Sequence, residues 1–398
     1  MKKTLLIAAL ASAALVSCSK VQVVEIPQDE IKFSVVADNA TKAAHVYGTN
    51  NLMSSFTVYA DYDTDSAEPI EYISGDEMTV ISASEINYAA NVTRYWPATV
   101  NATNTMTFYA IADGEIAGGR TAGTAPTVTG FAIPGEVEVA GTVNETNAMA
   151  KVTGQKDLLY AVKTVTGRDA PVALNFRHAL SLIEFKARCT NTTLKVTVTG
   201  VKVGNVKHTA DFSFPTVVTD GRIDETTEDD VTELSTGVGS WSNHENITAR
   251  HEYVATFTET SALSAVATDL TYRNPSAINS ENNSMLLLPQ TLNDPWDGNT
   301  LSGNTTGAYI AVKCTISNVG ANSTYTQLYS GWAYMPLGAA APSPTWEPGK
   351  KYVYTFVFGT GNAGYDENGD PVLAPIDYTV TVDDFDAFTG GNTEVDME

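Results

Sequence analysis

The sequence predicts an all-β protein built from antiparallel sandwiches, and three observations carry this prediction. Apolar and polar residues alternate strictly over Leu194–Thr199 and Ile376–Asp383, which is the pattern of strands with one buried face. Gly, Pro, Asn and Asp separate such runs, as turns require. No amphipathic helix of ten or more residues is evident, although Asp76–Ile86 could form a short one.

Length and charge set the domain count and exclude some partners. The 398 residues exceed one ordinary domain and fit two, and an apolar fraction of 43% is enough to fill two cores. We place the boundary near residue 175, which gives domains over 18–175 and 176–398. The formal net charge of −23 argues against nucleic acid and anionic lipid as partners, because binding either needs clustered Lys and Arg.

Further short segments rich in Val, Thr, Tyr and Phe are expected to be strands, because β-branched and aromatic side chains suit a pleated sheet. In chain order these segments are Ile31–Val36, Phe56–Ala60, Met106–Ile111, Leu158–Val165, Val172–Phe176, Leu182–Ala187, Ser284–Leu288, Tyr309–Ile316 and Tyr352–Phe358. Their shortness and frequency favour antiparallel sandwiches over strand–helix–strand units. Within Tyr365–Asp370, Asn-Gly favours a hairpin turn over an ion-binding loop.

The first 17 residues have the features of a secretory signal. Lys2 and Lys3 precede an apolar run over Leu5–Val16, which is too short to span a bilayer. The run ends in Leu-Val-Ser-Cys, which resembles the bacterial lipobox, so Cys18 is the predicted site of lipidation. The alternative is a plain signal peptide with an incidental Cys.

The remaining residues offer little for catalysis. The five His lack metal-ligand spacing, and no GxSxG or P-loop motif is present. We therefore predict no enzyme activity, no cofactor and no metal ion. His178 follows an apolar strand and is expected to be a hydrogen-bonded structural residue. Cys189 and Cys314 either form a disulfide or remain buried free thiols.

Eight short motifs in order, together with the lipobox, resemble the fimbrillin lipoproteins of Bacteroidales (major/minor fimbrial subunit-like, type V pilins). The resemblance covers most of the chain after residue 17. The motifs are Ile31–Phe33, Thr41–Ala43, Tyr95–Pro97, Met106–Ala110, Asp157–Ala161, Leu174–Leu180, Leu286–Gln290 and Trp346–Tyr352.

This resemblance implies two transthyretin-like β-sandwich domains in tandem and a role as a pilus subunit that supports adhesion. Its partners would be other pilin subunits and a ligand on a host or bacterial surface. In the family, the precursor reaches the outer membrane as a lipoprotein. A protease then removes the lipid anchor with the first strand, and a strand from the next subunit fills the gap.

Applied to this sequence, the scheme assigns roles to particular residues. The removable strand would place Ile31, Phe33 and Val35 in the core. Lys42 is the only basic residue of the 37–47 loop and is the predicted processing site, whereas known members are cut after Arg and the first Arg here is Arg94. The predicted donor strand presents four apolar residues on one face: Ile376, Tyr378, Val380 and Val382.

Several alternatives stay open at this point. Lys42 is equally well explained as a solvated loop residue of an unprocessed chain. The segment after Asp383 alternates poorly, so a tip or anchor subunit is as compatible with the sequence as a shaft subunit. A different function is a monomeric surface lipoprotein that binds glycans through exposed aromatic side chains. However, the wide spacing of the five Trp favours core or loop-anchoring positions.

Overall fold

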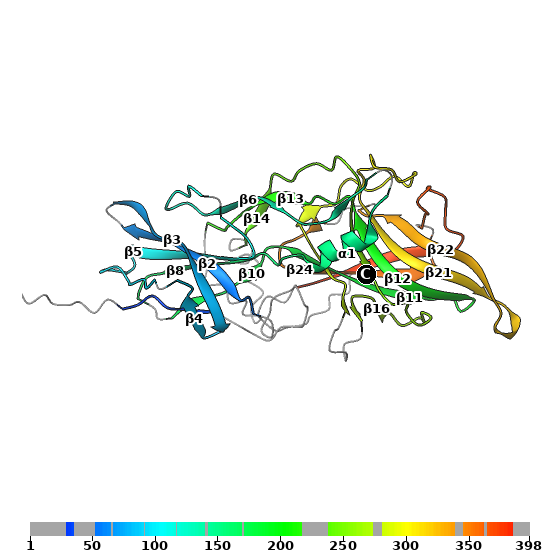
Figure 1. Ribbon diagram of the computed structural model, residues 1–398, viewed down its shortest axis with the longest axis horizontal. Coiled ribbons are helices and arrows are strands. Elements are labelled where there is room, and N and C mark those ends of the chain that lie inside the picture. Colours follow the sequence, from blue (N-terminus) through cyan, green and yellow to red (C-terminus); the bar gives the residue numbers. More distant parts are fainter. Residues whose placement is uncertain are drawn as a thin grey trace, which may run out of the picture.

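The computed structural model is elongated, with the early strands at one end and many of the later strands at the other (Figure 1). Nearly all of its regular structure is β-sheet, which confirms the predicted all-β class. The structure describes residues 29–35, 52–64, 67–90, 92–116, 118–139, 142–168, 171–216, 238–273, 281–338, 345–361 and 364–384.

The early part of the chain forms a six-stranded antiparallel sheet, largely blue and cyan in Figure 1. In spatial order its strands are β10 (Arg177–His178), β8 (Leu159–Val165), β5 (Asn104–Ala112), β2 (Ser55–Thr64), β3 (Ala67–Ser82) and β4 (Glu85–Tyr88). A short parallel pair, β1 (Phe33–Val35) and β9 (Val172–Leu174), contributes to the same apolar core. Edge-to-face contacts of Phe56 with Phe176 and of Trp96 with Phe108 fill this core.

A second, larger core lies between two sheets formed mainly by later residues. One sheet is antiparallel, in the order β22 (Tyr325–Pro336), β21 (Tyr309–Val319), β12 (Leu194–Gly204), β15 (His251–Thr256) and β7 (Glu136–Val137). The other contains β16 (Thr268–Asp269), β11 (Ser181–Cys189), β24 (Lys350–Phe358) and β25 (Ile376–Asp384), with β19 (Met285–Leu287) also paired to β11. Within it, β11 and β24 run parallel over eight residue pairs.

Contacts between the two parts of the chain do not follow the sequence order strictly. β6 (Thr127–Ala132) pairs with β13 (Thr209–Ser213), which also pairs with β14 (Ser240–Ser242). β7 and α1 (Glu145–Thr153), the one α-helix of the described residues, contact β15 before the chain returns to the first sheet as β8. Two minor ladders join β17 (Tyr272–Arg273) to β18 (Glu281–Asn282) and β20 (Gln290–Thr291) to β23 (Thr345–Trp346), and a 3₁₀ turn, η1, spans Ala321–Ser323. The boundary near residue 175 stays a prediction.

Helix α1 lies where none was predicted, and the segment proposed as a short helix is strand. Asp76–Ser82 ends β3, and Glu85–Ile86 begins β4. Three consecutive β-branched residues, Thr79, Val80 and Ile81, favour the extended backbone, and pairing with β2 and β4 supplies the hydrogen bonds. Helix α1 buries only Ala148 and Val152, so its apolar stripe is too narrow to stand out in the sequence.

Candidate functional site

The first described strand, β1, contributes its side chains to the core that the six-stranded sheet also lines. Ile31, Phe33 and Val35 are at most 4% exposed, so the alternation correctly predicts that they face the core. The Phe33 ring contacts Phe108 and Tyr88 edge to face, with centroids 5.6 Å and 6.3 Å away. The apolar side chains are therefore the main link between this strand and the sheet.

Backbone hydrogen bonds hold β1 at a few points on both sides. β1 pairs in parallel with β9 over three residues, and the Val172 amide donates to the Lys32 carbonyl over 2.7 Å. On the other side, the amides of Ile31 and Val35 donate to the carbonyls of Arg94 and Ala83, each over 2.8 Å. These few hydrogen bonds therefore contribute less to the free energy that holds β1 in place than its buried side chains do.

Two other predicted site residues, Cys18 and Lys42, lie outside the described residues, as does the signal segment 1–17. Their predicted roles in lipidation and processing stay predictions. Lys42 belongs to the segment between Val35, the last residue of β1, and Leu52, where the description resumes.

The predicted donor strand is an edge strand in this structure. β25 pairs antiparallel with β24 through all nine of its residues, and β24 is its only neighbour in the sheet order of the described residues. Ile376 is fully buried, and Tyr378, Val380 and Val382 are partly buried against the larger core. The apolar face is thus covered by the strand's own chain, while one backbone edge remains unpaired among the described strands.

Several minor sequence predictions can be assessed directly. Cys189 and Cys314 are buried free thiols rather than a disulfide. His178 is fully buried and its Nδ1 lies 3.0 Å from Asp157 Oδ1, which confirms a hydrogen-bonded structural role. The predicted hairpin turn is also present, since Tyr365 forms an antiparallel bridge with Pro371 and the Asp370 amide donates to Asp366 Oδ1.

A buried ionic group, which we call the Glu252 cluster, lies on β12, β15 and β21, with members just before β15 and just after β7. It comprises Glu252, Lys202, Arg250, Glu138 and Tyr309. Lys202 Nζ lies 2.8 Å from one Glu252 oxygen, and an Arg250 nitrogen lies 2.7 Å from the other. Arg250 also binds Glu138 at 3.0 Å, and the Tyr309 hydroxyl donates to Glu252. Burial would raise the pKa of Glu252, but the charges of Lys202 and Arg250 outweigh it and lower that pKa.

The sequence did not predict this cluster, because charged residues on a strand are normally expected to face solvent. Here the face that carries Lys202 is covered by a small aromatic core that includes Trp296, Tyr309 and Tyr334. Lys202 Nζ also lies 4.3 Å from the centre of the Trp332 ring. The one available signal was the run Arg250-His251-Glu252 directly before an apolar strand.

Two histidines form a second buried polar feature. The rings of His208 and His251 stack with centroids 4.2 Å apart. Neither ring nitrogen of His251 has a hydrogen-bond partner among the described residues. Burial, together with the nearby His208 and Lys151, lowers the pKa of His251 to about 3, and burial also lowers the pKa of His208. Both rings are therefore neutral at physiological pH.

The described residues show no cluster of three or more potential metal ligands. In the same part of the chain, every helix is too short or too polar to cross a membrane. Trp96, Trp296 and Trp346 are buried, as their spacing predicts, and Trp241 and Trp332 are partly buried. The tryptophans therefore do not form an exposed platform for stacking on sugars.

Comparisons with known proteins identify the family. A fimbrial protein from Bacteroides vulgatus has a similar structure, with 14% identity and a TM-score of 0.47 over 90% of this chain and 99% of that chain. Candidate cell adhesion proteins from Bacteroides uniformis and Bacteroides ovatus each give 14% identity and a TM-score of 0.41, over 90% of this chain and 99% and 97% of theirs. No curated protein matches the chain. The model of the fimbrillin-like family matches residues 41–381, and the chain therefore belongs to that family.

Proposed function

We propose that this chain is a fimbrial subunit that is exported as an outer-membrane lipoprotein, assembles by donor-strand exchange and supports adhesion at the cell surface. Membership of the fimbrillin-like family supports the fimbrial role. The position of β1 is the observation that carries the assembly mechanism, because it combines full burial with an N-terminal location and a short ladder.

Removing β1 would leave a vacancy that a second strand can fill. The vacancy would be lined by Phe108 and Tyr88, which contact Phe33, and by β9, whose amides and carbonyls face β1. Unpaired backbone groups and an open apolar core are both costly in water. A strand from another subunit would restore the ladder and the core together.

β25 has the chemistry required of that incoming strand. Its apolar residues recur at every second position, as Ile31, Phe33 and Val35 do, so either strand presents the same kind of face. As an edge strand with one described neighbour, β25 loses only one ladder on leaving its own sheet. This argument supports Ile376, Tyr378, Val380 and Val382 as the donor residues.

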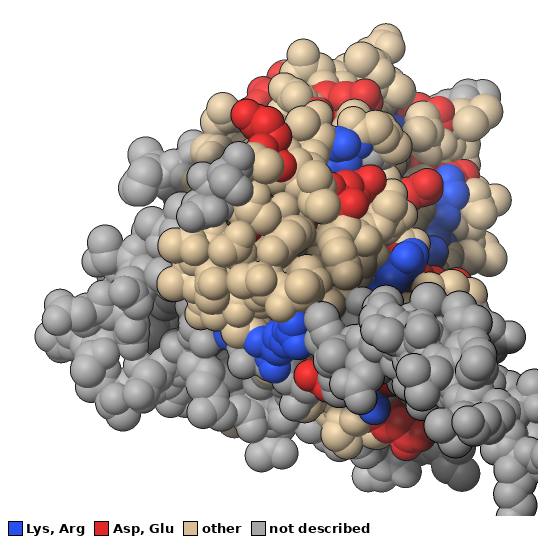
Figure 2. Space-filling view, turned by 90° about the vertical axis from the view of Figure 1, so that its left-hand side faces the viewer, with Lys and Arg blue, Asp and Glu red and all other residues tan. Residues whose placement is uncertain are grey.

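Surface charge at the end that carries the early strands is compatible with the approach of a second subunit. Figure 2 shows a broad area without charged side chains there, with acidic and basic groups around it. Because the whole chain has a net charge of −23, an uncharged face reduces the like-charge repulsion between copies.

Cleavage of the purified mature chain with a Lys-specific endoprotease tests the processing step. We expect a new N-terminus at Ala43, loss of β1 and the appearance of ladders on SDS gels of unheated samples, whereas uncut protein stays monomeric. Lys42→Gln should suppress both the cut and the ladders. A chain that starts at Ala43 and remains monomeric, or a Lys42→Gln variant that polymerises as well as the wild type, would contradict the proposal.

A matched pair of variants tests whether β25 is the donor strand. Val380→Asp places a charge on the apolar face of β25, whereas Thr379→Asp places it on the exposed face of the same strand. We expect ladders from cleaved Thr379→Asp and none from cleaved Val380→Asp, with both uncut variants still folded by circular dichroism. Equal polymerisation of the two variants would assign the donor to another segment.

Mass spectrometry of the protein extracted from membranes tests the lipid anchor. An N-terminal Cys18 carrying acyl chains is the expected result, and replacement of Cys18 with Ala should release the protein from the membrane fraction. An unmodified Cys18 on membrane-bound protein would overturn this part of the proposal.

A further inference from the structure

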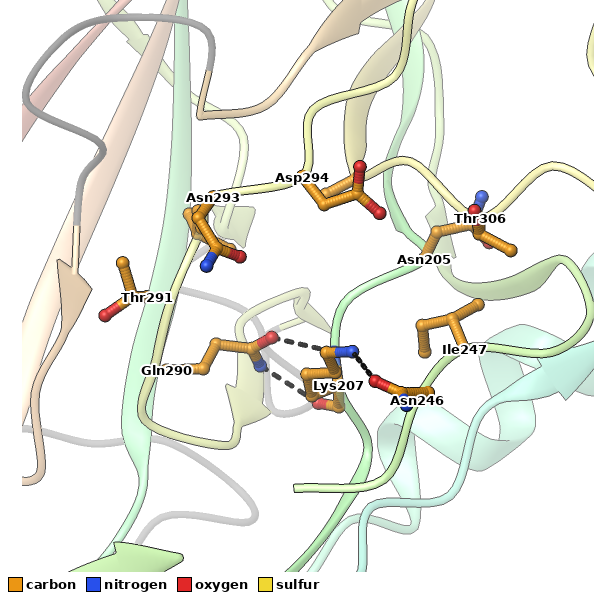
Figure 3. A pocket seen from close by; sticks show the side chains of 11 residues that line it. Asn205, Lys207, Asn246, Ile247, Gln290, Thr291, Asn293, Asp294 and Thr306 are labelled. Carbon is orange, nitrogen blue, oxygen red and sulfur yellow. Dashed lines mark hydrogen bonds between the residues drawn. The ribbon is translucent and has the colours of Figure 1, made fainter. Parts of the chain in front are cut away.

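A polar pocket of about 250 Å³ lies beside the larger sandwich, and none of its lining residues belongs to β1 or β25 (Figure 3). Four separate segments line it. They are the residues after β12, the loop after β14, the segment that begins with β20, and the loop before β21. The volume is below the range of about 300–1,000 Å³ that is usual for drug-sized ligands, so a single ring suits it better.

The back wall of the pocket is fixed by two side-chain amides whose hydrogen bonds all go to the backbone. Gln290 Oε1 accepts from the Lys207 amide at 2.7 Å, and its Nε2 donates to the carbonyls of Lys207 and Leu288. Asn205, which has a φ of 57°, donates through Nδ2 to the carbonyls of Thr305 and Gly307. These bonds tie three of the four segments together, so the pocket is formed before a ligand arrives.

Other polar groups at the pocket remain available. Lys207 Nζ donates to Asn246 Oδ1 at 3.0 Å and keeps two further donors. Asp294, Asn293 and Thr306 have side chains that face solvent, with no side-chain hydrogen-bond partner among the described residues. Figure 3 shows Asp294 and Asn293 across the pocket from Lys207 and Asn246. Donors and acceptors thus surround the same space.

The pocket also has an apolar surface. Ile247, Leu292 and Ala308 line it and are 9%, 2% and 4% exposed. A ligand that fits must therefore combine several hydroxyl or amide groups on its edge with a C–H face.

These features exclude several ligand classes. One Lys opposite one Asp does not favour a phosphate, because the carboxylate repels it. No aromatic side chain lines the pocket to stack on a nucleobase, and a single carboxylate is too few for a calcium site. We propose that the pocket binds one pyranose unit of a glycan, with its hydroxyls bonded to Asp294, Asn246 and Lys207 and its C–H face on Ile247.

This inference is independent of donor-strand assembly, because every residue used lies in the uncut monomer. It names a ligand class for adhesion and locates the contact in the chain. A failure of polymerisation would leave it intact, and a failure of sugar binding would leave the assembly proposal intact.

Saturation-transfer NMR on the uncleaved mature chain tests the pocket. The probes are the methyl glycosides of glucose, galactose, mannose, N-acetylglucosamine and N-acetylgalactosamine, with glycerol as a polyol without a ring. We expect at least one glycoside to bind with a Kd of about 0.1–10 mM, as suits a small site with few hydrogen bonds, and glycerol to give no comparable signal.

Variants then assign the binding to this pocket. Asp294→Ala and Asn246→Ala should each weaken binding at least tenfold. The matched controls are Asp63→Ala and Asn87→Ala, which remove exposed residues of the same types on β2 and β4 at the other end of the molecule and should leave binding unchanged. Absence of binding by every glycoside, binding that survives both pocket variants, or equal binding of glycerol would overturn the inference.

Discussion

Replacing Glu252 with Ala should lower the free energy of unfolding by about 3–5 kcal/mol, the usual cost of breaking a buried ion pair from one side. The carboxylate is fully buried and binds Lys202 Nζ at 2.8 Å and Arg250 at 2.7 Å. Without it, two buried cations face each other with only Glu138 as a described carboxylate partner. Their desolvation is then no longer compensated.

Urea denaturation followed by circular dichroism measures this effect. Lys32→Ala is the control, because Lys32 pairs with Glu30 at the surface with its side chain 64% exposed. Such a pair contributes at most about 1 kcal/mol. A loss below about 1 kcal/mol for Glu252→Ala would mean that water or a rearrangement compensates the cluster.

Acid should destabilise the fold through His251. The pKa of His251 is about 3 in the folded state, against 6.5 for a histidine in the unfolded chain. Below pH 6.5 the unfolded state therefore binds a proton that the folded state does not. The contribution of His251 to the free energy of unfolding is therefore fully present above about pH 6.5. It falls by up to about 1.4 kcal/mol per pH unit toward pH 3. The titratable neighbours of His251 are His208 and Lys151, which oppose its protonation, and Glu252, which favours it.

The measurement compares the pH dependence of unfolding in the wild type and in His251→Gln. Titrating carboxylates act on both proteins, so the difference between the two curves isolates the histidine. We expect that difference to change between pH 6.5 and pH 4 and to be flat above pH 7. Parallel curves over the whole range would show that His251 becomes protonated without unfolding the site.

Local sequence patterns predicted eleven of the 25 described strands, because alternation reports directly on a half-buried sheet, but they missed the long strands β3 and β22. Ile376–Asp383 and Tyr352–Phe358 are strands with nearly the predicted bounds. The same local rule misassigned Asp76–Ile86 and missed α1, whose buried face consists of two residues. Burial of Ile31, Phe33 and Val35 was predictable for the same reason as the strands themselves.

The all-β class, the family and the buried side of the predicted strands follow from residue type and period alone. Tertiary structure decided which strands pair and which polar groups are buried. It placed Lys202 under an aromatic cover and brought Asn246 and Asp294 to one pocket from loops about fifty residues apart. Pairing and burial depend on contacts between distant segments, and no local pattern of residues encodes those contacts.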